Sequence, residues 1–377
     1  MSQRAGPSVL DGVDLVDHHC HGLVRRDLDR PSLDALLTEA GAAEGVFDSQ
    51  IGFAVRRHCA PVLDLPPHTS VEDYLDRRTE LGVDDVTRRL LAATGTTTYL
   101  VDTGYAPEPI TSPAELAALT GAAAHEIVRL ERLAEEAVVS GCTAASFADD
   151  VRRLLWDRSR DAVAVKSIAA YRVGLDLAPE RPCAADVVAA VDRWLVSVDE
   201  GRPVRCADEV LTRFLIWEGL DRGLPLQVHV GLGDVDVDLH RCDPLLLTPL
   251  LRATAPLGVP VMLLHNYPFH RHAGYLAQVF PHVYVDVGLA THNVGRAAGR
   301  LIAETLELAP FGKFLFSSDA FGLPELYHLG AVLFRRGLDD FLIGGVEAGD
   351  WSVADAARVA RMVGHENARR AYALQPS

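Results

Sequence analysis

The segment Asp17-His18-His19-Cys20-His21-Gly22 places two histidines two positions apart, directly after the apolar run Val13-Asp14-Leu15-Val16. Successive side chains of a strand alternate between its two faces, so we expect Asp17, His19 and His21 to point the same way and Cys20 to point away. Two imidazoles at positions i and i+2 can bind one divalent metal ion. A single pair does not establish a metal site, so the rest of the chain must supply further ligands.

Four later apolar segments also carry side chains that could act at such a site. Their polar residues are Lys166, His229, His265 and Asp319. Taken singly, each has an ordinary structural explanation, such as a helix cap for Asp319 or an ion pair for Lys166. Together with the His-x-His pair they give four histidines and a carboxylate. That set suits Zn²⁺, Fe²⁺ or Mn²⁺ and disfavours Ca²⁺ and Mg²⁺.

The elements that must position these residues alternate between apolar strands and helices. The predicted strands, mostly apolar as in a buried parallel sheet, are 13–17, 97–102, 126–130, 162–168, 225–230, 260–265, 283–287 and 313–317. Helical patterns between them include 130–138, 147–157, 184–198, 208–222, 244–255 and 295–308, and the tail 353–374 predicts a closing helix. This order predicts an α/β fold of the (β/α)8 TIM-barrel type, with an open doubly wound sheet as the alternative. On a barrel the strand ends converge on one rim, which would make the candidate ligands neighbours.

Two connections, 22–96 and 171–224, are too long for simple crossovers. Both follow the C-terminal end of a strand, the side on which barrel active sites lie. We interpret 22–96 as a helical insertion that forms a lid or side wall, with a packing or dimerisation appendage as the alternative. The expected organisation is therefore one barrel domain over residues 1–377 that contains the insertion 22–96.

The composition narrows the class of protein and its partners. With 36 basic and 52 acidic residues, the net charge of −16 disfavours nucleic acid or an anionic membrane surface as partner. The N-terminus lacks an apolar signal core, and no apolar run reaches the roughly 18 residues of a membrane span. The 6 cysteines form no CxxC pair, which predicts reduced thiols in a cytoplasmic protein. We expect a small-molecule substrate, and a homodimer is possible.

Lys166 lies in a predicted apolar strand, where a charged side chain is unusual and calls for an explanation. A protonated lysine is a poor metal ligand, but a lysine carboxylated by CO₂ becomes an anionic carbamate that can bridge two metal ions. The alternative is that Lys166 stays a cation and contacts the substrate or an acidic residue.

The motifs in combination resemble the amidohydrolase superfamily, specifically its amidohydrolase 2 branch. Within that branch the chain is similar to the amidohydrolase domain of FluG-like and nodulin/glutamine synthetase-like proteins. The resemblance runs in order along nearly the whole chain. It is carried by VDHHCHG (16–22), VKSIAAYRVGL (165–175), QVHVGLGD (227–234), LHNYP (264–268), VDVGL (285–289), SSDA (317–320) and ENARRAY (366–372).

The resemblance implies a metal site made by His19, His21, His229, His265 and Asp319. With a carboxylated Lys166 the site would hold two ions, and otherwise one, with zinc as the first expectation and iron or manganese as alternatives. The leading hypothesis is hydrolysis of an amide or other C–N or acyl bond. Metal-bound hydroxide would attack a carbonyl, with Asp319 as general base and acid.

Substrate contacts are expected from residues beyond the ligands. Arg172 and Tyr171 could bind a substrate carboxylate, since arginine offers a bidentate fork, although Arg172 could equally form a structural ion pair. Asp234 and His292 are further substrate-binding candidates, and Tyr105, Asp102 and Glu131 could line the mouth.

Three other functions fit the same residues. They are non-hydrolytic decarboxylation, ester or thioester hydrolysis, and a regulatory barrel that binds metal without turnover. The barrel fold supports several reactions and does not choose among them.

Overall fold

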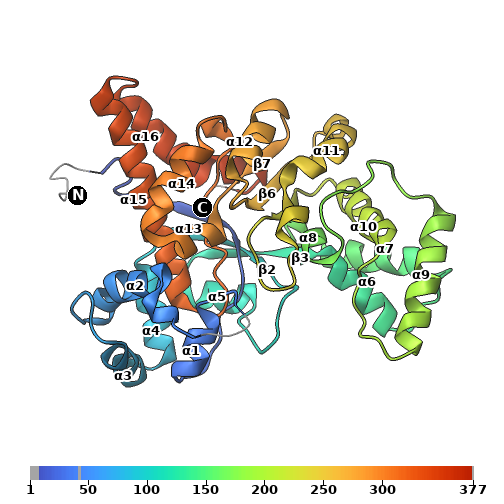
Figure 1. The fold of residues 1–377 in the computed structure, drawn as a ribbon, viewed down its shortest axis with the longest axis horizontal. Coiled ribbons are helices and arrows are strands. Elements are labelled where there is room, and N and C mark those ends of the chain that lie inside the picture. The colour runs from blue at the N-terminus through green and yellow to red at the C-terminus, as the bar shows by residue number, and fades with distance from the viewer. Residues whose placement is uncertain (1–7, 41–43, 376–377) are drawn as a thin grey trace.

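The computed structural model describes residues 8–40 and 44–375. Its centre is a sheet of seven parallel strands in the order β1-β2-β3-β4-β5-β6-β7, so each strand pairs with the next one along the chain. The strands are β1 (Leu15–Cys20), β2 (Thr96–Asp102), β3 (Ala123–Arg129), β4 (Ala164–Ser167), β5 (Leu226–Val230), β6 (Val261–His265) and β7 (Val283–Val285). Figure 1 shows the curled sheet with helices packed around it.

The sheet closes through the segment that follows Lys313. Phe314 forms a parallel bridge with Val285 of β7, and the amide of Leu315 donates to the carbonyl of Val285 at 3.0 Å. On the other side, the amide of His18 in β1 donates to the carbonyl of Phe316 at 3.1 Å. This segment occupies the eighth position of the barrel. The expected strand 313–317 is therefore wrong as a regular strand, because the segment makes too few ladder bonds, while the (β/α)8 fold is confirmed.

Helices follow the strands as the barrel plan requires. They are α5 (Pro113–Thr120), α6 (Leu130–Val139), α7 (Phe147–Arg158), α8 (Ala169–Arg172), α9 (Ala184–Asp199), α10 (Glu209–Asp221), α11 (Thr248–Thr254), α12 (His270–Val279), α13 (Gly288–Val294), α14 (Ala298–Thr305) and α15 (Pro324–Ala348). The predicted helices 244–255 and 295–308 are broken by short 3₁₀ turns at Pro244–Leu247 and Gly295–Ala297. Within the described residues, none of these helices combines the length and the apolar character needed to cross a membrane.

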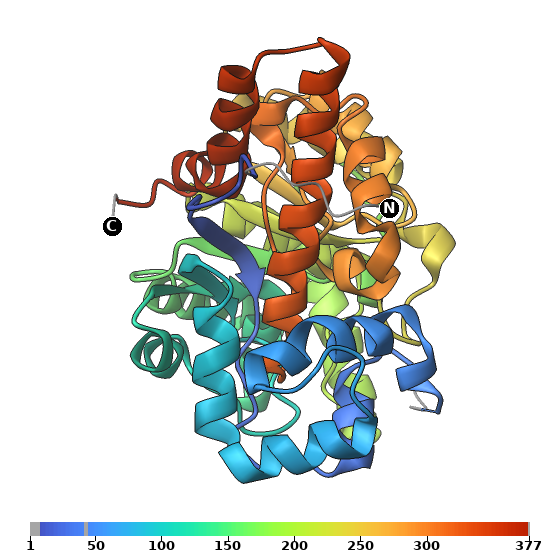
Figure 2. The ribbon, with the colours of Figure 1, turned by 90° about the vertical axis from the view of Figure 1, so that its left-hand side faces the viewer.

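The insertion 22–96 is helical, as expected. It contains α1 (Arg30–Leu36), α2 (Gln50–Ala54), a π-helical turn at Val55–Cys59, a 3₁₀ turn at Ala60–Leu63, α3 (Val71–Leu81) and α4 (Val83–Ala92). Its apolar side chains form one cluster with residues of α15, including Tyr327 and Leu333. In Figure 2 these blue and light-blue helices lie at the opposite end of the molecule from α16 (Val353–Arg361).

The C-terminal tail closes the other end of the barrel. After α16 the chain continues as a π-helical turn, Met362–Glu366, and then α17 (Asn367–Ala371). Ala368, Ala371 and Tyr372 pack against apolar side chains of the barrel strands, such as Leu100 and Met262. The predicted closing helix over 353–374 is therefore present, but a π-helical turn divides it into two α-helices.

The first strand departs from strict alternation. Its register against β2 shifts between Asp17 and Cys20. Asp17 contacts Ser318, His18 contacts Asp286 and Tyr372, and His19 contacts Lys166. The expectation that Asp17, His19 and His21 share one face is therefore wrong for Asp17, whereas His19 and His21 do lie together, beside Asp319. Because the register is irregular, the side chains of β1 do not alternate strictly between its two faces. His18 can therefore contact Asp286 while the adjacent His19 contacts Lys166.

Candidate metal centre

Three imidazoles converge on the carboxylate of Asp319. Nε2 of His19 and Nε2 of His21 lie 3.0 Å and 3.5 Å from Oδ1 of Asp319, and Nδ1 of His265 lies 3.6 Å from Oδ2. The main chain fixes this arrangement, because the amide of Asp319 donates to the carbonyl of His19 at 3.0 Å. The ends of the first strand, the sixth strand and the closing segment therefore meet at one point.

Two of these residues have an unusual backbone conformation. His265 has φ of 68° and Asp319 has φ of 51°, both in the left-handed region that non-glycine residues rarely adopt. Each such residue costs on the order of 1–3 kcal/mol and persists only where its surroundings hold it. The chain thus turns sharply at the ends of β6 and of the closing segment, with both side chains kept in the cluster.

Asp286, just after β7, holds His265 in place. Its Oδ1 accepts hydrogen bonds from the amides of His265 at 2.8 Å and Gly288 at 2.9 Å, and its Oδ2 lies 2.8 Å from Nε2 of His18. Nδ1 of His18 is in turn 2.9 Å from the hydroxyl of Tyr372. This buried chain of polar contacts links the candidate ligand His265 to the C-terminal tail.

His229 completes the set of four histidines. Its ring lies 4.6 Å from the ring of His265 and 4.4 Å from the ring of Tyr171, measured between centroids. Burial, and then the nearby His265 and Lys166, hold the pKa of His229 well below its usual range. Burial, followed by Lys166, lowers the pKa of His19 to about 3. Both imidazoles are therefore neutral near pH 7, which leaves a nitrogen lone pair on each for a metal ion.

Several donor atoms in this cluster are buried without a hydrogen-bond partner among the described residues: Nδ1 of His19, Nε2 of His229, Nδ1 and Nε2 of His265, and Oδ1 of Asp319. Buried polar atoms without partners are rare in folded proteins and each calls for an explanation. The donor atoms of His19, His265 and Asp319 lie within 4.8 Å of one another, as do those of His19, His21 and Asp102. Nitrogen and carboxylate donors at these spacings fit a divalent transition metal.

Lys166 lies against the second of these groups, which shares His19 with the first. Its side chain is 3 % exposed, and Nζ is 2.8 Å from Nε2 of His19 and 3.1 Å from Oδ2 of Asp102. Burial lowers the pKa of Lys166, partly opposed by Asp102. Arg129, at the end of β3, contacts the same Oδ2 of Asp102 at 2.6 Å. One carboxylate is thus shared by two cationic side chains.

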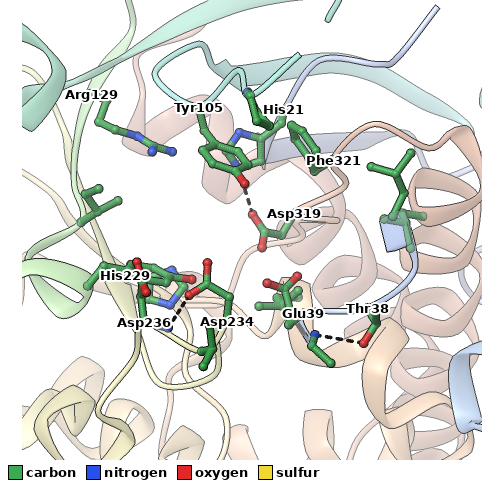
Figure 3. Close-up of a pocket in the computed structure, with 18 of the residues that line it drawn as sticks. His21, Thr38, Glu39, Tyr105, Arg129, His229, Asp234, Asp236, Asp319 and Phe321 are labelled. Atoms are coloured by element: carbon green, nitrogen blue, oxygen red, sulfur yellow. Dashed lines mark hydrogen bonds and ion pairs between the residues drawn. The ribbon is translucent and has the colours of Figure 1, made fainter. Parts of the chain in front are cut away.

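A cavity of about 530 Å³ opens onto this cluster. Strand ends supply His21, Lys166, His229 and Asp319, and the insertion supplies residues from Ala35 to Ala40. Figure 3 shows Asp319 near the centre, with Tyr105 and His21 on one side and Glu39 and Asp234 on the other. The size suits a small molecule, since ligand cavities typically measure about 300–1,000 Å³.

All four predicted substrate-binding residues line this cavity. The Arg172 guanidinium already pairs with Glu135 at 3.2 Å, as the structural alternative expected. Tyr171 lies against His229, and Asp234 accepts a hydrogen bond from the amide of Asp236 at 2.8 Å. His292 of α13 is buried, and its Nδ1 has no partner among the described residues. Whether these residues contact a substrate stays a prediction.

Three residues of the site have roles that the sequence analysis did not foresee. Asp102 was expected only at the mouth, yet it belongs to a group of possible metal donors. Arg129 could have been found by the signal that identified His229, a polar side chain at the end of a strand. Glu39 had no comparable signal, because it lies in the insertion after α1, where no strand end points to the site.

Known proteins resemble this chain in sequence and in fold. Protein fluG of Emericella nidulans is 32% identical over 243 residues, which cover 61% of this chain and 28% of fluG. The matched region is thus less than a third of the length of that relative. A "putative metal-dependent hydrolase" from Lactobacillus casei is 29% identical, covers 97% of this chain and 96% of its own, and superposes with a TM-score of 0.85.

The fold extends to more distant proteins. A uronate isomerase from Bacillus halodurans shares it with a TM-score of 0.64 over 97% of this chain and 95% of its own, at 14% identity. The model of the amidohydrolase family matches residues 16–374, from the first strand to the tail that closes the barrel. Because this match covers nearly the whole chain, the protein belongs to the amidohydrolase family.

Proposed function

We propose that this protein is a metal-dependent hydrolase that cleaves an amide or another C–N or acyl bond of a small molecule. The observation that carries the proposal is the convergence of His19, His21 and His265 on Asp319, with buried donor atoms that lack other partners. The cavity beside this cluster gives a small substrate access to it.

The metal would be held by His19, His21, His229, His265 and Asp319. A divalent ion bound there would acidify a water molecule and polarise the carbonyl oxygen of the substrate. Zinc is our first expectation, because histidine nitrogen and carboxylate oxygen are among its usual ligands, with iron or manganese as alternatives.

Asp319 is the residue that would move the proton. Burial alone would raise the pKa of Asp319, but His265 and His19 hold it well below its usual range, so the carboxylate is ionised. It can accept a proton from the attacking water and pass it to the leaving nitrogen, which leaves as an amine. The hydrogen bond from its own amide to His19 keeps the carboxylate from turning away from the cluster.

We further propose that Lys166 is carboxylated and that the site holds two ions. The support is its location: Nζ is within 3.1 Å of both His19, which belongs to both groups of donors, and Asp102, which belongs to one of them. Burial favours the neutral amine, which is the form that reacts with CO₂.

The proposal is tested with metal analysis and a substrate panel. We expect the purified protein to contain stoichiometric divalent metal, to lose activity with a chelator and to regain it when metal is restored. The panel should contain matched amides, esters and thioesters that share one acyl group, so that only the bond differs. Metal-free protein with full activity, or no turnover of any acyl compound, would overturn the proposal.

Decarboxylation is the second candidate. The contact of Lys166 with Asp102 is one that an unmodified, cationic lysine makes, and a single metal beside such a cation suits a carboxylate substrate. Release of CO₂ from an unsaturated or aromatic acid, without hydrolysis of the matched amides, would favour this reaction.

A further inference from the structure

The charges that line the cavity are not evenly paired. Besides Asp319, four acidic residues line it: Glu39, Glu108, Asp234 and Asp236. Glu108 pairs with Arg26 at 2.9 Å, and Asp236 pairs with Arg205 at 3.1 Å. Across residues 8–40 and 44–375, no cationic side chain forms an ion pair with Glu39 or Asp234.

The cations of the same cavity are already engaged. Arg129 and Lys166 share Asp102, and Arg172 is paired with Glu135. None of them is therefore free to neutralise Glu39 and Asp234. Two carboxylates therefore face the cavity without a counter-ion among the described residues.

The two carboxylates share one part of the cavity. Figure 3 shows the side chains of Glu39 and Asp234 turned toward the same space beside Asp319. They come from different elements, since Glu39 belongs to the insertion and Asp234 follows β5. Burial, and then the charges of Asp319 and Asp234, raise the pKa of Glu39 to about 7, the behaviour of an acid that lacks a counter-ion.

The surroundings are those of a cation site. The rings of Tyr105 and Tyr171 line the same cavity, and aromatic faces attract cations. The buried His292 also lines the cavity, and its Nδ1 has no hydrogen-bond partner among the described residues. A net charge of −16 would also draw cations toward the protein.

We propose that the substrate carries a cationic group, an ammonium or a guanidinium, that binds between Glu39 and Asp234. This inference rests on the proposed function, because the cationic group would be bound while the scissile bond lies at Asp319. The hydrolase would thus act on amides or related acyl compounds of a positively charged amine. Neutral and anionic analogues would be poor substrates, because they leave both carboxylates in the cavity without a counter-charge.

The test uses two probes of nearly equal shape and different charge, n-butylguanidinium and N-butylurea. A guanidinium stays protonated at pH 8.5 and has no lone pair for a metal ion, so its binding reports the carboxylates. By calorimetry on the metal-loaded protein, we expect n-butylguanidinium to bind at least tenfold more tightly than N-butylurea. Glu39→Gln and Asp234→Asn should each weaken n-butylguanidinium about tenfold and leave N-butylurea unchanged.

Glu108→Gln is the matched control, because it removes a carboxylate of the same cavity that Arg26 already neutralises. It should leave the binding of n-butylguanidinium unchanged. Equal affinity of the wild-type protein for the two probes would overturn the inference, and this comparison does not depend on a variant folding. The binding assay needs no turnover, so the two proposals can fail separately. If the protein binds n-butylguanidinium preferentially but hydrolyses no acyl compound, only the proposed function is contradicted. If the protein hydrolyses acyl compounds but binds both probes equally well, only the inference of a cationic substrate is contradicted.

Discussion

The carboxylate of Asp17 accepts two hydrogen bonds from Ser318, one from its amide at 2.9 Å and one from its hydroxyl at 2.5 Å. Both residues are buried. The pair joins the first strand to the segment that carries Asp319. The two parts of the chain that carry the ligands farthest apart in sequence are therefore hydrogen-bonded to each other beside the site.

Removal of this contact should loosen the metal centre. Ser318→Ala leaves one oxygen of Asp17 buried without its donor and also removes the acceptor for the amide of Ala320. We expect the free energy of unfolding to fall by about 1–3 kcal/mol and the affinity for metal to fall as well. Denaturant titration and a competitive metal-binding assay measure the two effects. Ser317→Ala is the matched control, since the Ser317 hydroxyl has no partner among the described residues, and an equal loss in both variants would contradict the prediction.

Asp319→Asn tests the proton-transfer role. An amide of the same shape cannot accept the proton, so kcat should fall by about 10²–10⁴-fold. The histidines remain, so most of the metal should be retained by elemental analysis. A variant that loses its metal but regains normal kcat when metal is added in excess would show that Asp319 is a ligand alone.

Lys166→Ala distinguishes a carbamate from a cation. If the residue is carboxylated, the variant should lose metal and activity, and acetate or propionate should restore part of both by supplying a carboxylate to the vacated space. If Lys166 acts as a cation, ethylamine should be the molecule that restores activity. The measurement is activity and metal content against the concentration of each additive, and rescue by the amine alone would contradict the two-ion proposal.

The insertion should depend on a buried ion pair for its attachment. Arg78 of α3 contacts Glu325 of α15 at 2.6 Å, with side chains 6% and 0% exposed, and Tyr74 donates to the same carboxylate at 2.9 Å. Arg78→Ala leaves a buried charge without its partner, which should destabilise the protein by about 3–5 kcal/mol. The exposed pair Arg88–Asp85 is the control, and Arg88→Ala should cost about 0–1 kcal/mol by thermal or denaturant unfolding.

Glu39 should make the stability of the metal-free protein depend on pH. Its pKa is about 7 in the folded state against an ordinary value of 4.5, so between these pH values the folded state binds more protons than the unfolded state. The free energy of unfolding therefore falls as pH rises through this window. Relative to the wild type, Glu39→Gln should gain stability between pH 4.5 and pH 7, by on the order of 1–2 kcal/mol after solvent screening. A difference that does not vary with pH would contradict the expectation.

The barrel and the members of its rim cluster could be predicted because their signal is local. His229 and His265 lie at the ends of apolar strands. In a parallel barrel the ends of the strands lie close together, regardless of which side chains the rest of each strand carries. The shift in β1 was not predictable, since alternation is the default and the departure depends on contacts with Ser318, Asp286 and Lys166, which come from distant parts of the chain. Glu39 was missed for the same reason, because a loop residue gains its place in a cavity only through the packing of the whole insertion.

The polar chain from His265 through Asp286 and His18 to Tyr372 has a consequence for how motion at one end of the barrel reaches the other. Tyr372 packs with α17 against the barrel strands, whereas His265 lies at the opposite ends of those strands, in the candidate metal centre. Undocking of the tail would remove Tyr372 from His18 and leave His18 free to turn away from Asp286. Loosening of the tail is therefore coupled to loosening of the support behind the metal centre.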